Sequence, residues 1–420
     1  MNDDNKPPEA VPSSTPTHRH DRLLDEAARQ LNERGVLMTS LAEIAAQLGV
    51  TRAAMYYYVA DREDLVFQCY RRAAEVTARR LTEAAREGDS PADVLRRFFV
   101  RMMDPNEPEL AARAEIAMLT QQQRDTIAGL YDALATHIAH LIESGRREGA
   151  FRDCDAQVTA RAILSLITWA PLARPWAQAM GPLAHSRLTE ALCNVVFEGF
   201  SAQRVLPRFT PIELSALTPR TGGAFDRDAA LQAKREALMR VASRLFNRKG
   251  IDSTSLDEIA AQVGTTKRTL HHHIGSKQDL VSACYDRAFR IFLFISQRML
   301  EHPGTRLEAL AAAMHALALA YPNEELAPLS PLVGYGALSE DAKARFNENS
   351  RRLIDAYHSS VHRGVEEGSI RPIDVDAQVL MLPGLLSWLV KDDVPTDPDQ
   401  RRHIAREIAN VAAVGLRRSS

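Results

Sequence analysis

Apolar residues recur every three or four positions along most of this chain, which is the spacing of helices that bury one face. In residues 21–34 the apolar positions are Leu23, Leu24, Ala27, Ala28 and Leu31. Similar patterns predict helices over residues 61–86, 91–103, 108–119, 122–148, 156–170 and 185–203, and later over 277–301, 306–320, 338–367, 376–390 and 398–418. No segment alternates like a strand, so the pattern predicts an all-α protein.

The same pattern occurs twice. Residues 35–70 and 250–285 align without a gap, and roughly 20 of about 50 positions agree between residues 21–70 and 236–285. The longest shared run is Glu-Ile-Ala-Ala-Gln, at residues 43–47 and 258–262. A weaker echo follows, because Asp-Ala-Gln-Val occurs at residues 155–158 and 376–379. A repeat of domain length indicates two tandem copies of one unit rather than a solenoid.

Capping residues divide the repeated block into three short helices. Gly35 is placed to end the first helix. Ser40 followed by Glu43, and Ser255 followed by Glu258, match the capping box at the start of a second helix. Gly49 lies where the chain must bend, and the next threonine, Thr51, can cap a third helix. Two short helices joined by a glycine turn predict a helix-turn-helix in each copy.

The third helix carries a more specific pattern. Residues 51–65, Thr-Arg-Ala-Ala-Met-Tyr-Tyr-Tyr-Val-Ala-Asp-Arg-Glu-Asp-Leu, resemble the recognition-helix signature of the TetR (tetracycline-repressor) family of bacterial transcriptional regulators. In that signature a Leu-Tyr-x-His-Phe core precedes Lys-Glu-x-Leu. The chain departs from it at Tyr58, Val59, Arg62, His271 and Ile274. The resemblance implies two TetR-like units in tandem, each a three-helix helix-turn-helix domain followed by a helical bundle for ligand binding and dimerisation.

The resemblance also implies domain boundaries. We expect a disordered tail at residues 1–18 and helix-turn-helix domains at 19–66 and 229–281, each followed by a helical regulatory domain, at 67–205 and 282–420. Residues 206–228 contain several Pro, Thr and Gly residues and little helical periodicity, which predicts a linker. In dimers of this family the last two helices of each subunit form a four-helix bundle. Covalent fusion would let the two halves do so within one chain as a pseudo-dimer, and a homodimer is the alternative.

Residue roles at the DNA follow from the same resemblance. The start of each third helix would meet base edges in the major groove, through Arg52, Ala53 and Tyr57 in copy one and Lys267, Arg268 and His272 in copy two. Hydroxyl and cationic groups around it would contact phosphates: Thr39, Ser40, Thr51, Tyr56 and Arg62 in copy one, and Thr254, Ser255, Thr266, His271 and Lys277 in copy two. The second recognition segment is the more basic. Tyr58 is as well explained by packing as by DNA contact.

Composition sets limits on other functions. The formal net charge of −2 means that any DNA binding must come from a local basic face. No apolar run approaches the roughly 20 residues of a membrane span. The four cysteines lie far apart without paired spacing, which favours a reducing compartment, and hence the cytoplasm, over a zinc or disulfide framework. Three successive histidines from residue 271 cannot converge on one ion in a helix, so no metal and no cofactor are predicted.

The middle helices of TetR-like subunits enclose a pocket for a small, mostly apolar inducer, and the resemblance implies such an effector here. Residues at helical spacing that would line it are Phe98, Met102, His137, Trp169, His315 and Trp388, although each fits an ordinary helical core as well.

No catalytic motif appears, so we do not expect an enzyme. The chain is therefore interpreted as a sequence-specific DNA-binding regulator, a repressor released by a ligand. The alternative is a helical adaptor that kept the fold and lost DNA binding in one or both copies.

Overall fold

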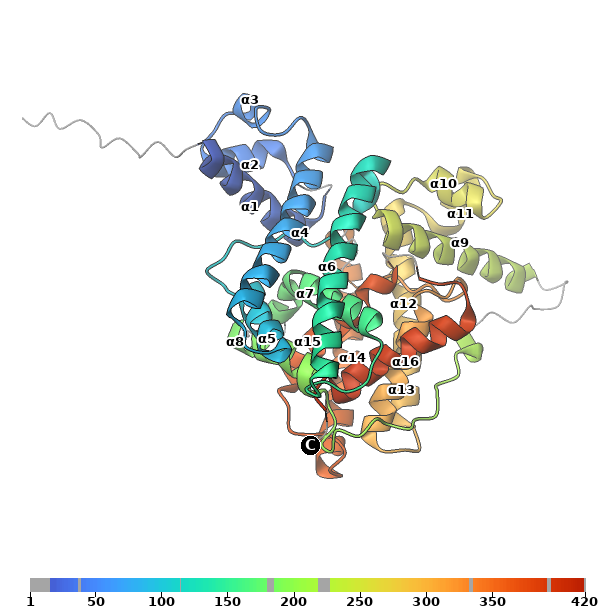
Figure 1. Cartoon of the computed structure of the whole chain (residues 1–420). Coiled ribbons are helices and arrows are strands. Elements are labelled where there is room, and N and C mark those ends of the chain that lie inside the picture. Colours follow the sequence, from blue (N-terminus) through green and yellow to red (C-terminus); the bar gives the residue numbers. More distant parts are fainter. Residues whose placement is uncertain are drawn as a thin grey trace, which may run out of the picture.

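A computed structural model describes residues 16–36, 39–113, 115–179, 185–217, 227–331, 335–390 and 394–418. No strand occurs within these ranges, and the predicted all-α fold is confirmed (Figure 1). The first half contains α1 (Pro16–Arg34), α2 (Leu41–Leu48), α3 (Arg52–Met55), α4 (Arg62–Glu87), α5 (Pro91–Met102), η1 (Ile116–Met118), α6 (Gln121–Arg147), α7 (Ala156–Ala179), α8 (His185–Cys193) and η2 (Asn194–Glu198).

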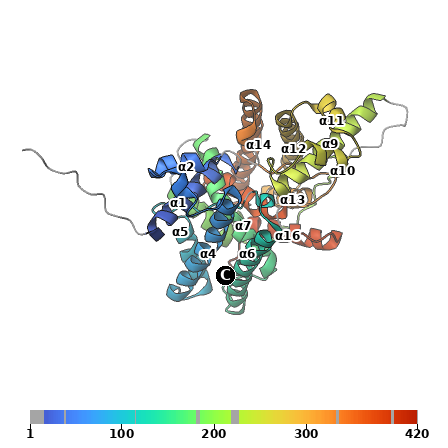
Figure 2. The same ribbon diagram turned by 90° about the horizontal axis from the view of Figure 1, so that it is seen from above.

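The second half repeats this order after a short turn, η3 (Ser215–Leu217). Its elements are α9 (Arg227–Lys249), α10 (Leu256–Gln262), α11 (Lys267–Ile274), α12 (Lys277–Leu300), α13 (Arg306–Ala320), η4 (Tyr335–Ala337), α14 (Glu340–Glu366), α15 (Val375–Met381), η5 (Leu382–Leu385), η6 (Ser387–Val390) and α16 (Pro398–Val414). The first three helices of each half lie on one side of the molecule, and the bundle helices lie below them (Figures 1 and 2).

Residues 108–119, which the periodicity assigned to a helix, form only the short 3-10 turn η1 within their described part, residues 108–113 and 115–119, so that prediction is wrong. Asn32 of α1 bonds two backbone groups of this segment. Its amide donates to Leu110 O (2.9 Å) and accepts from Ala112 N–H (2.8 Å). Asn247 holds the matching segment of the second half, bonding Pro328 O and Ser330 N–H at 2.8 Å each. The two asparagines fasten each first helix to the bundle below it.

Three other predicted helices end early. Residues 376–390 form α15 and then two 3-10 turns, because Pro383 cannot donate the next helical hydrogen bond. The last helix of each half stops at a glycine with positive φ, Gly199 (+61°) and Gly415 (+62°), rather than reaching residues 203 and 418.

These two glycines mark a reciprocal exchange between the halves. After Gly199 the chain pairs with the α14–α15 turn, where Arg371 N–H donates to Phe200 O (2.9 Å). After Gly415 it pairs with the α6–α7 turn, where Arg152 N–H donates to Leu416 O (2.8 Å). A Cβ atom at either glycine would come within 2.5 Å of the backbone of the other half. Each half therefore completes the bundle of the other.

Helices of opposite halves also pack directly: α7 and α8 lie against α15, η5, η6 and α16. The Trp169 indole of α7 donates to Leu380 O of α15 (2.8 Å). Arg187 of α8 forms an ion pair with Asp374 at the start of α15 (2.6 Å), and His403 of α16 hydrogen-bonds Asp155 before α7 (2.9 Å). One continuous hydrophobic core runs through the first half and the second bundle.

The predicted linker is packed rather than extended over its described part. Phe209 and Ile212 are buried, and the Phe209 ring lies 5.5 Å from the His315 ring and 4.5 Å from the Arg406 guanidinium. Residues 218–226 and the first fifteen residues of the predicted tail lie outside the described residues.

Helices α4 and α12 run continuously across the predicted boundaries at residues 66 and 281, so movement of either helix reaches both domains of its half.

No helix of the described ranges is both long enough and apolar enough to span a membrane.

Candidate nucleic-acid interface and interior cavity

The first recognition segment is a single helical turn with aromatic residues at its end. Thr51 caps α3, its hydroxyl accepting from Ala54 N–H (3.2 Å). Met55 is fully buried and anchors the turn, whereas 81% of Tyr57 and 48% of Tyr56 are exposed. The Arg52 guanidinium donates to the Tyr56 hydroxyl (3.2 Å). Ala53 and Arg62 are exposed on the same unit.

The second recognition segment is longer and carries more cationic side chains. Thr266 caps α11, and Leu270 anchors it in the core of its own domain. Lys267, Arg268, His271 and His272 are exposed, as are Thr266 and Ser255. Lys267 forms an ion pair with Asp257 of α10 (2.9 Å), which leaves Arg268 as the cation projecting from the first turn of α11 without an ion pair in the described structure.

Four of the hydroxyl groups predicted to contact phosphates already form hydrogen bonds within their own domains. Ser40, which is half-buried, and Ser255 accept from Glu43 N–H (3.4 Å) and Glu258 N–H (3.0 Å). Thr39 and Thr254 are buried, and their hydroxyls donate to Gly35 O and Gly250 O at 2.8 Å each. The structure thus places these two threonines inside their domains, where a phosphate does not reach them.

Lys277 is also placed differently from the prediction. It is half-buried, and its ammonium donates to Asp252 O (3.3 Å). Burial lowers the pKa of this ammonium, while the carboxylates of Asp252 and Glu115 oppose that shift. The charge of Lys277 is therefore directed toward acidic groups of the protein rather than toward solvent.

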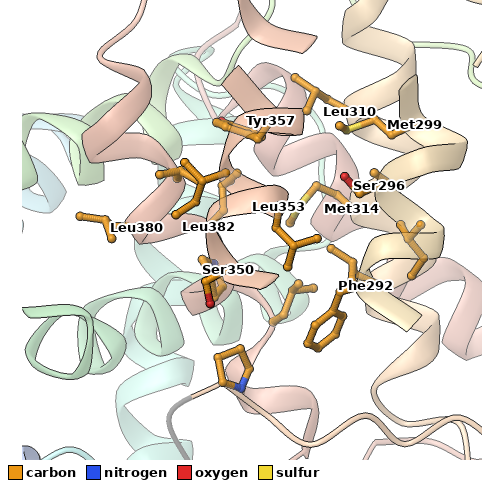
Figure 3. A pocket seen from close by; sticks show the side chains of 18 of the residues that line it. Phe292, Ser296, Met299, Leu310, Met314, Ser350, Leu353, Tyr357, Leu380 and Leu382 are labelled. Atoms are coloured by element: carbon orange, nitrogen blue, oxygen red, sulfur yellow. The ribbon is translucent and has the colours of Figure 1, made fainter. Parts of the chain in front are cut away.

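The second bundle encloses a cavity of about 360 Å³, lined mainly by apolar side chains of α12, α13 and α14 (Figure 3). Phe292 and Met299 of α12, Met314 of α13 and Leu353 of α14 surround it, and Phe200 reaches it from the first half. The Ser350 and Tyr357 hydroxyls also line it. Each is buried with no hydrogen-bond partner among the described residues.

None of the six residues predicted to line a ligand pocket lines this cavity. Phe98 and Trp169 belong to the core, and His137 is exposed. Met102 borders a void of about 50 Å³ in the first half, and Trp388 borders a polar cleft between the halves. His315 lies under Phe209 of the linker, where burial and then Arg406 of α16 lower its pKa to about 4. Met and aromatic residues at helical spacing fill the whole bundle, so spacing did not single out the cavity.

The described residues contain no cluster of three or more His, Cys, Asp or Glu side chains able to hold a metal ion.

Comparison with known proteins identifies the two recognition units. The family described as "Bacterial regulatory proteins, tetR family" matches residues 23–69 and again residues 238–284. The family described as "Tetracyclin repressor-like, C-terminal domain" matches residues 88–200. The chain belongs to the TetR family. It carries two TetR-type DNA-binding domains in tandem. The TetR-family proteins that it matches are transcriptional regulators rather than enzymes.

Individual TetR-family proteins align with one half at a time. The chain is 29% identical to the HTH-type transcriptional regulator AcrR of Shigella flexneri over 142 residues, 30% of this chain and 65% of that protein, just under two thirds. It is 29% identical to the HTH-type transcriptional repressor KstR2 of Mycobacterium tuberculosis over 160 residues, 35% of this chain and 74% of that protein. The crystal structure of PfmR from Thermus thermophilus is 26% identical and covers 43% of this chain and 99% of its own, with a TM-score of 0.37.

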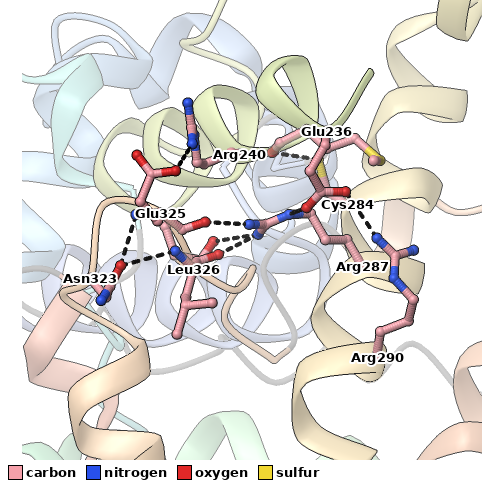
Figure 4. Close-up of polar contacts among 10 residues, drawn as sticks. Glu236, Arg240, Cys284, Arg287, Arg290, Asn323, Glu325 and Leu326 are labelled. Carbon is pink, nitrogen blue, oxygen red and sulfur yellow. Dashed lines mark hydrogen bonds and ion pairs between the residues drawn. The ribbon is translucent and has the colours of Figure 1, made fainter. Parts of the chain in front are cut away.

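Sequence reasoning missed the polar contacts that join each TetR-type DNA-binding domain to its bundle. Arg287 of α12 is buried and donates to Glu236 of α9, to Leu326 O and to Glu325 O, while Arg290 also pairs with Glu236 (Figure 4). In the first half the corresponding guanidinium, Arg72, pairs with Asp25 (2.6 Å). The signal was present in the repeat. Asn32, Arg72 and Asp21 recur 215 positions later as Asn247, Arg287 and Glu236.

Proposed function

We propose that this chain is a repressor that occupies an operator with both helix-turn-helix units and leaves it when a small, mostly apolar molecule enters the second bundle. The observation that carries the proposal is the cavity of about 360 Å³, because its main wall, α12, begins directly after recognition helix α11. The volume lies in the range of small-molecule sites.

The chemistry of the cavity wall defines the class of ligand. Its side chains are overwhelmingly aliphatic or aromatic, which favours an apolar body. Leaving a hydroxyl buried without a partner costs about 1 to 3 kcal/mol, so a ligand that bonds Ser350 or Tyr357 gains affinity. We infer a ligand with a hydrocarbon or aromatic body and one hydrogen-bonding group.

The connection to DNA runs along one helix. Phe289, Phe292 and Met299 of α12 line the cavity, and only residues 275 and 276 separate α12 from α11. A ligand that binds better to a shifted position of α12 selects that position and moves α11 with it. Arg287 fixes α9 to the same helix, so the whole second DNA-binding domain follows.

The proposed DNA interface follows from exposure. Base edges would be read by Arg52, Ala53 and Tyr57 in the first unit and by Lys267, Arg268 and His272 in the second. Phosphates would be met by Ser40, Thr51, Tyr56 and Arg62, and by Ser255, Thr266 and His271. Thr39, Thr254 and Lys277 are left out because of their buried or occupied positions.

One chain is proposed to act as an intramolecular pseudo-dimer, since each half already holds the chain segment that completes the other. Its recognition helices would then read two half-sites about one DNA turn apart, roughly 34 to 36 Å. The half-sites would differ, with the guanine-richer one under the second unit, because Arg and Lys favour guanine edges and Ala53 offers only apolar contact. Such a regulator acts on the chromosome in the bacterial cytoplasm.

Salt-titrated binding to DNA from upstream of the chain's own gene tests the proposal, with sedimentation to count chains per complex. We expect tight, salt-sensitive binding by one chain, with a non-palindromic footprint. Two chains on a palindrome would establish the homodimer instead. Absence of salt-sensitive binding to any genomic fragment would leave the helical adaptor.

The ligand step is tested with N-phenyl-1-naphthylamine, an uncharged apolar fluorophore, as the probe. Leu317→Trp fills the cavity, and Leu319→Trp makes the same change on α13 at a residue that does not line it. We expect the probe to bind the parent and the Leu319 variant, to weaken their DNA binding, and to lose both effects in the Leu317 variant. Equal probe binding by both variants would refute the cavity as the site.

A further inference from the structure

One carboxylate of the first half lies between the two DNA-binding domains. Glu115 follows α5 and precedes η1, which packs against α9 of the second half. A Cβ atom on Gly250 would lie 2.7 Å from Glu115 Cγ, and one on Gly35 would lie 3.4 Å from Glu115 Oε1. Gly35 and Gly250 are the same position of the repeat, each at the end of a first helix with φ near +80°. A single side chain thus touches the equivalent point of both domains.

The groups around Glu115 come from both domains. Val36 of the first domain donates its backbone N–H to the carboxylate. Asp252 and Lys277 of the second domain supply the nearby charges. Glu115 N–H donates to the Tyr70 hydroxyl of α4 (3.3 Å), which fixes the loop to the first bundle.

Two charged residues that lie near this junction are paired within their own domains. Arg34, at the end of α1, pairs with Glu43 (2.9 Å), and Lys249, at the end of α9, pairs with Glu258. Glu115, in contrast, has neighbours in both domains.

We propose that Glu115 is a positioning residue that clasps the two DNA-binding domains together and so sets the separation of their recognition helices. The proposal rests on the function proposed above only where it concerns the operator. The clasp itself is a property of the free protein. At the same junction, Gly336 of η4 in the second half lies close to the end of α1, because a Cβ atom on it would be 3.9 Å from Arg34 O.

Protonation is coupled to this clasp. Burial and then the neighbouring Asp252 raise the Glu115 pKa to about 7, against the effects of Lys277 and the Val36 N–H. In an open state the carboxyl is solvated and its pKa returns to about 4.5. The closed state thus binds the proton more tightly, so acid favours closure. The ratio of closed to open molecules falls by up to about two orders of magnitude as pH rises from below 4.5 to above 7.

Spin labels on the two domains test the clasp without DNA. The labels are attached at Arg22→Cys on α1 and Lys234→Cys on α9, because both positions are exposed. Cys154→Ser removes the native cysteine that is not buried, so that the two labels report the distance between the domains. We expect a distribution that broadens from pH 6 to pH 8 in the parent. Glu115→Gln, which keeps the acceptor but cannot ionise, should stay narrow at both pH values, and Glu115→Ala should be broad at both. The control, Asp132→Asn, removes a carboxylate that pairs with Arg161 within the first half and should follow the parent.

Operators whose half-site spacing is changed by one or two base pairs provide the second measurement. The Gln variant should keep the parent's preference for the native spacing at pH 8, and the Ala variant should lose about tenfold of it while single half-sites bind as before. Unchanged distance distributions in both variants and at both pH values would overturn the clasp. If the Ala variant does not fold, the parent pH series and the Gln variant still decide. If no DNA binds, the repressor proposal fails while the label distances still test the clasp.

Discussion

The two halves share the same order of helices, caps and interhelical contacts, but they differ in the side chains of their interiors. The same residue types cap the helices, clamp the first helix to the bundle and end the last helix in both halves. Extending the ungapped register of the repeat along α4 and α12 places Arg80 opposite Ile295. Arg80 is buried and pairs with Glu107 (3.0 Å) beside the small void, whereas Ile295 lines the large cavity. The two copies therefore have the same architecture but different residues in the bundle interior.

The burial of α5 and α13 differs between the halves as well. The caps Ser90 and Thr305 keep the register, so Val100 of α5 corresponds to His315 of α13. Val100 is 52% exposed, whereas His315 is 3% exposed because Phe209 of the linker covers it. At the DNA end, Ala53 corresponds to Arg268. The second half thus holds both the large cavity and an exposed arginine on its recognition helix where the first half has an alanine.

The largest contrast between the halves is expected at Arg72 and Arg287. Arg287→Ala removes a buried guanidinium bonded to Glu236 and to backbone carbonyls, and should lower the free energy of unfolding by about 3 to 5 kcal/mol. Arg72→Ala, at a partly exposed ion pair, should cost about 1 kcal/mol or less. Urea denaturation of the two variants measures both. Equal losses would show that the two joints are equivalent.

The next effect is the acid sensitivity of the second half. The His315 pKa is lowered to about 4 in the folded protein, so below pH 6.5 the unfolded chain binds a proton that the folded chain does not. Stability should therefore fall from pH 6.5 to pH 4, by about 2 to 3 kcal/mol from this residue. Melting temperatures of the parent and of His315→Gln across this window show it. Val100→Ala, at the exposed counterpart, should leave the pH dependence unchanged.

At the DNA, Arg268→Ala should cost about 1 to 3 kcal/mol and relax base preference only in the second half-site. Arg52→Ala should do the same in the first half-site, with a smaller loss because Arg52 shares its charge with the Tyr56 hydroxyl. Selection from a random library with each variant measures both half-sites. Relaxed preference in the opposite half-site would show that the units are assigned to the wrong sides of the operator.

The smallest contrast is expected at the exchanged segments. Arg152 donates its side chain to Gly415 O (2.7 Å) and Arg371 donates to Gly199 O (2.8 Å), in matching geometry. Alanine at either position should cost about 1 kcal/mol, and the two losses should agree within the error of chemical denaturation. A large difference between them would mean that the pseudo-symmetry of the exchange is only apparent.

Capping residues and the internal repeat predicted those parts of the structure that depend on residues close in sequence. The caps at Ser40, Thr51 and Thr266, and the internal repeat, placed the helix-turn-helix units and indicated the family correctly. Periodicity failed at residues 108–119, where Asn32, nearly eighty positions away, bonds Leu110 O and Ala112 N–H in place of helical partners. It also did not locate the cavity, since a side chain beside a void and one in a filled core have the same spacing along a helix. The burial of Thr39 and Thr254 depends on a bond to a carbonyl four residues earlier, which composition does not reveal.

The exchanged segments have a consequence for the order of synthesis. The α6–α7 turn of the first half pairs with residues 416 and 417, which leave the ribosome more than 200 positions after that half has been made. At about 5 to 20 residues per second, the nascent first half waits on the order of ten to forty seconds for the segment that closes it. During that time its α7 and α8 faces are exposed to chaperones and to other nascent chains on the same message. Covalent fusion of the halves shortens the search for the correct partner once translation ends, because the missing segment is then tethered to the surface that receives it.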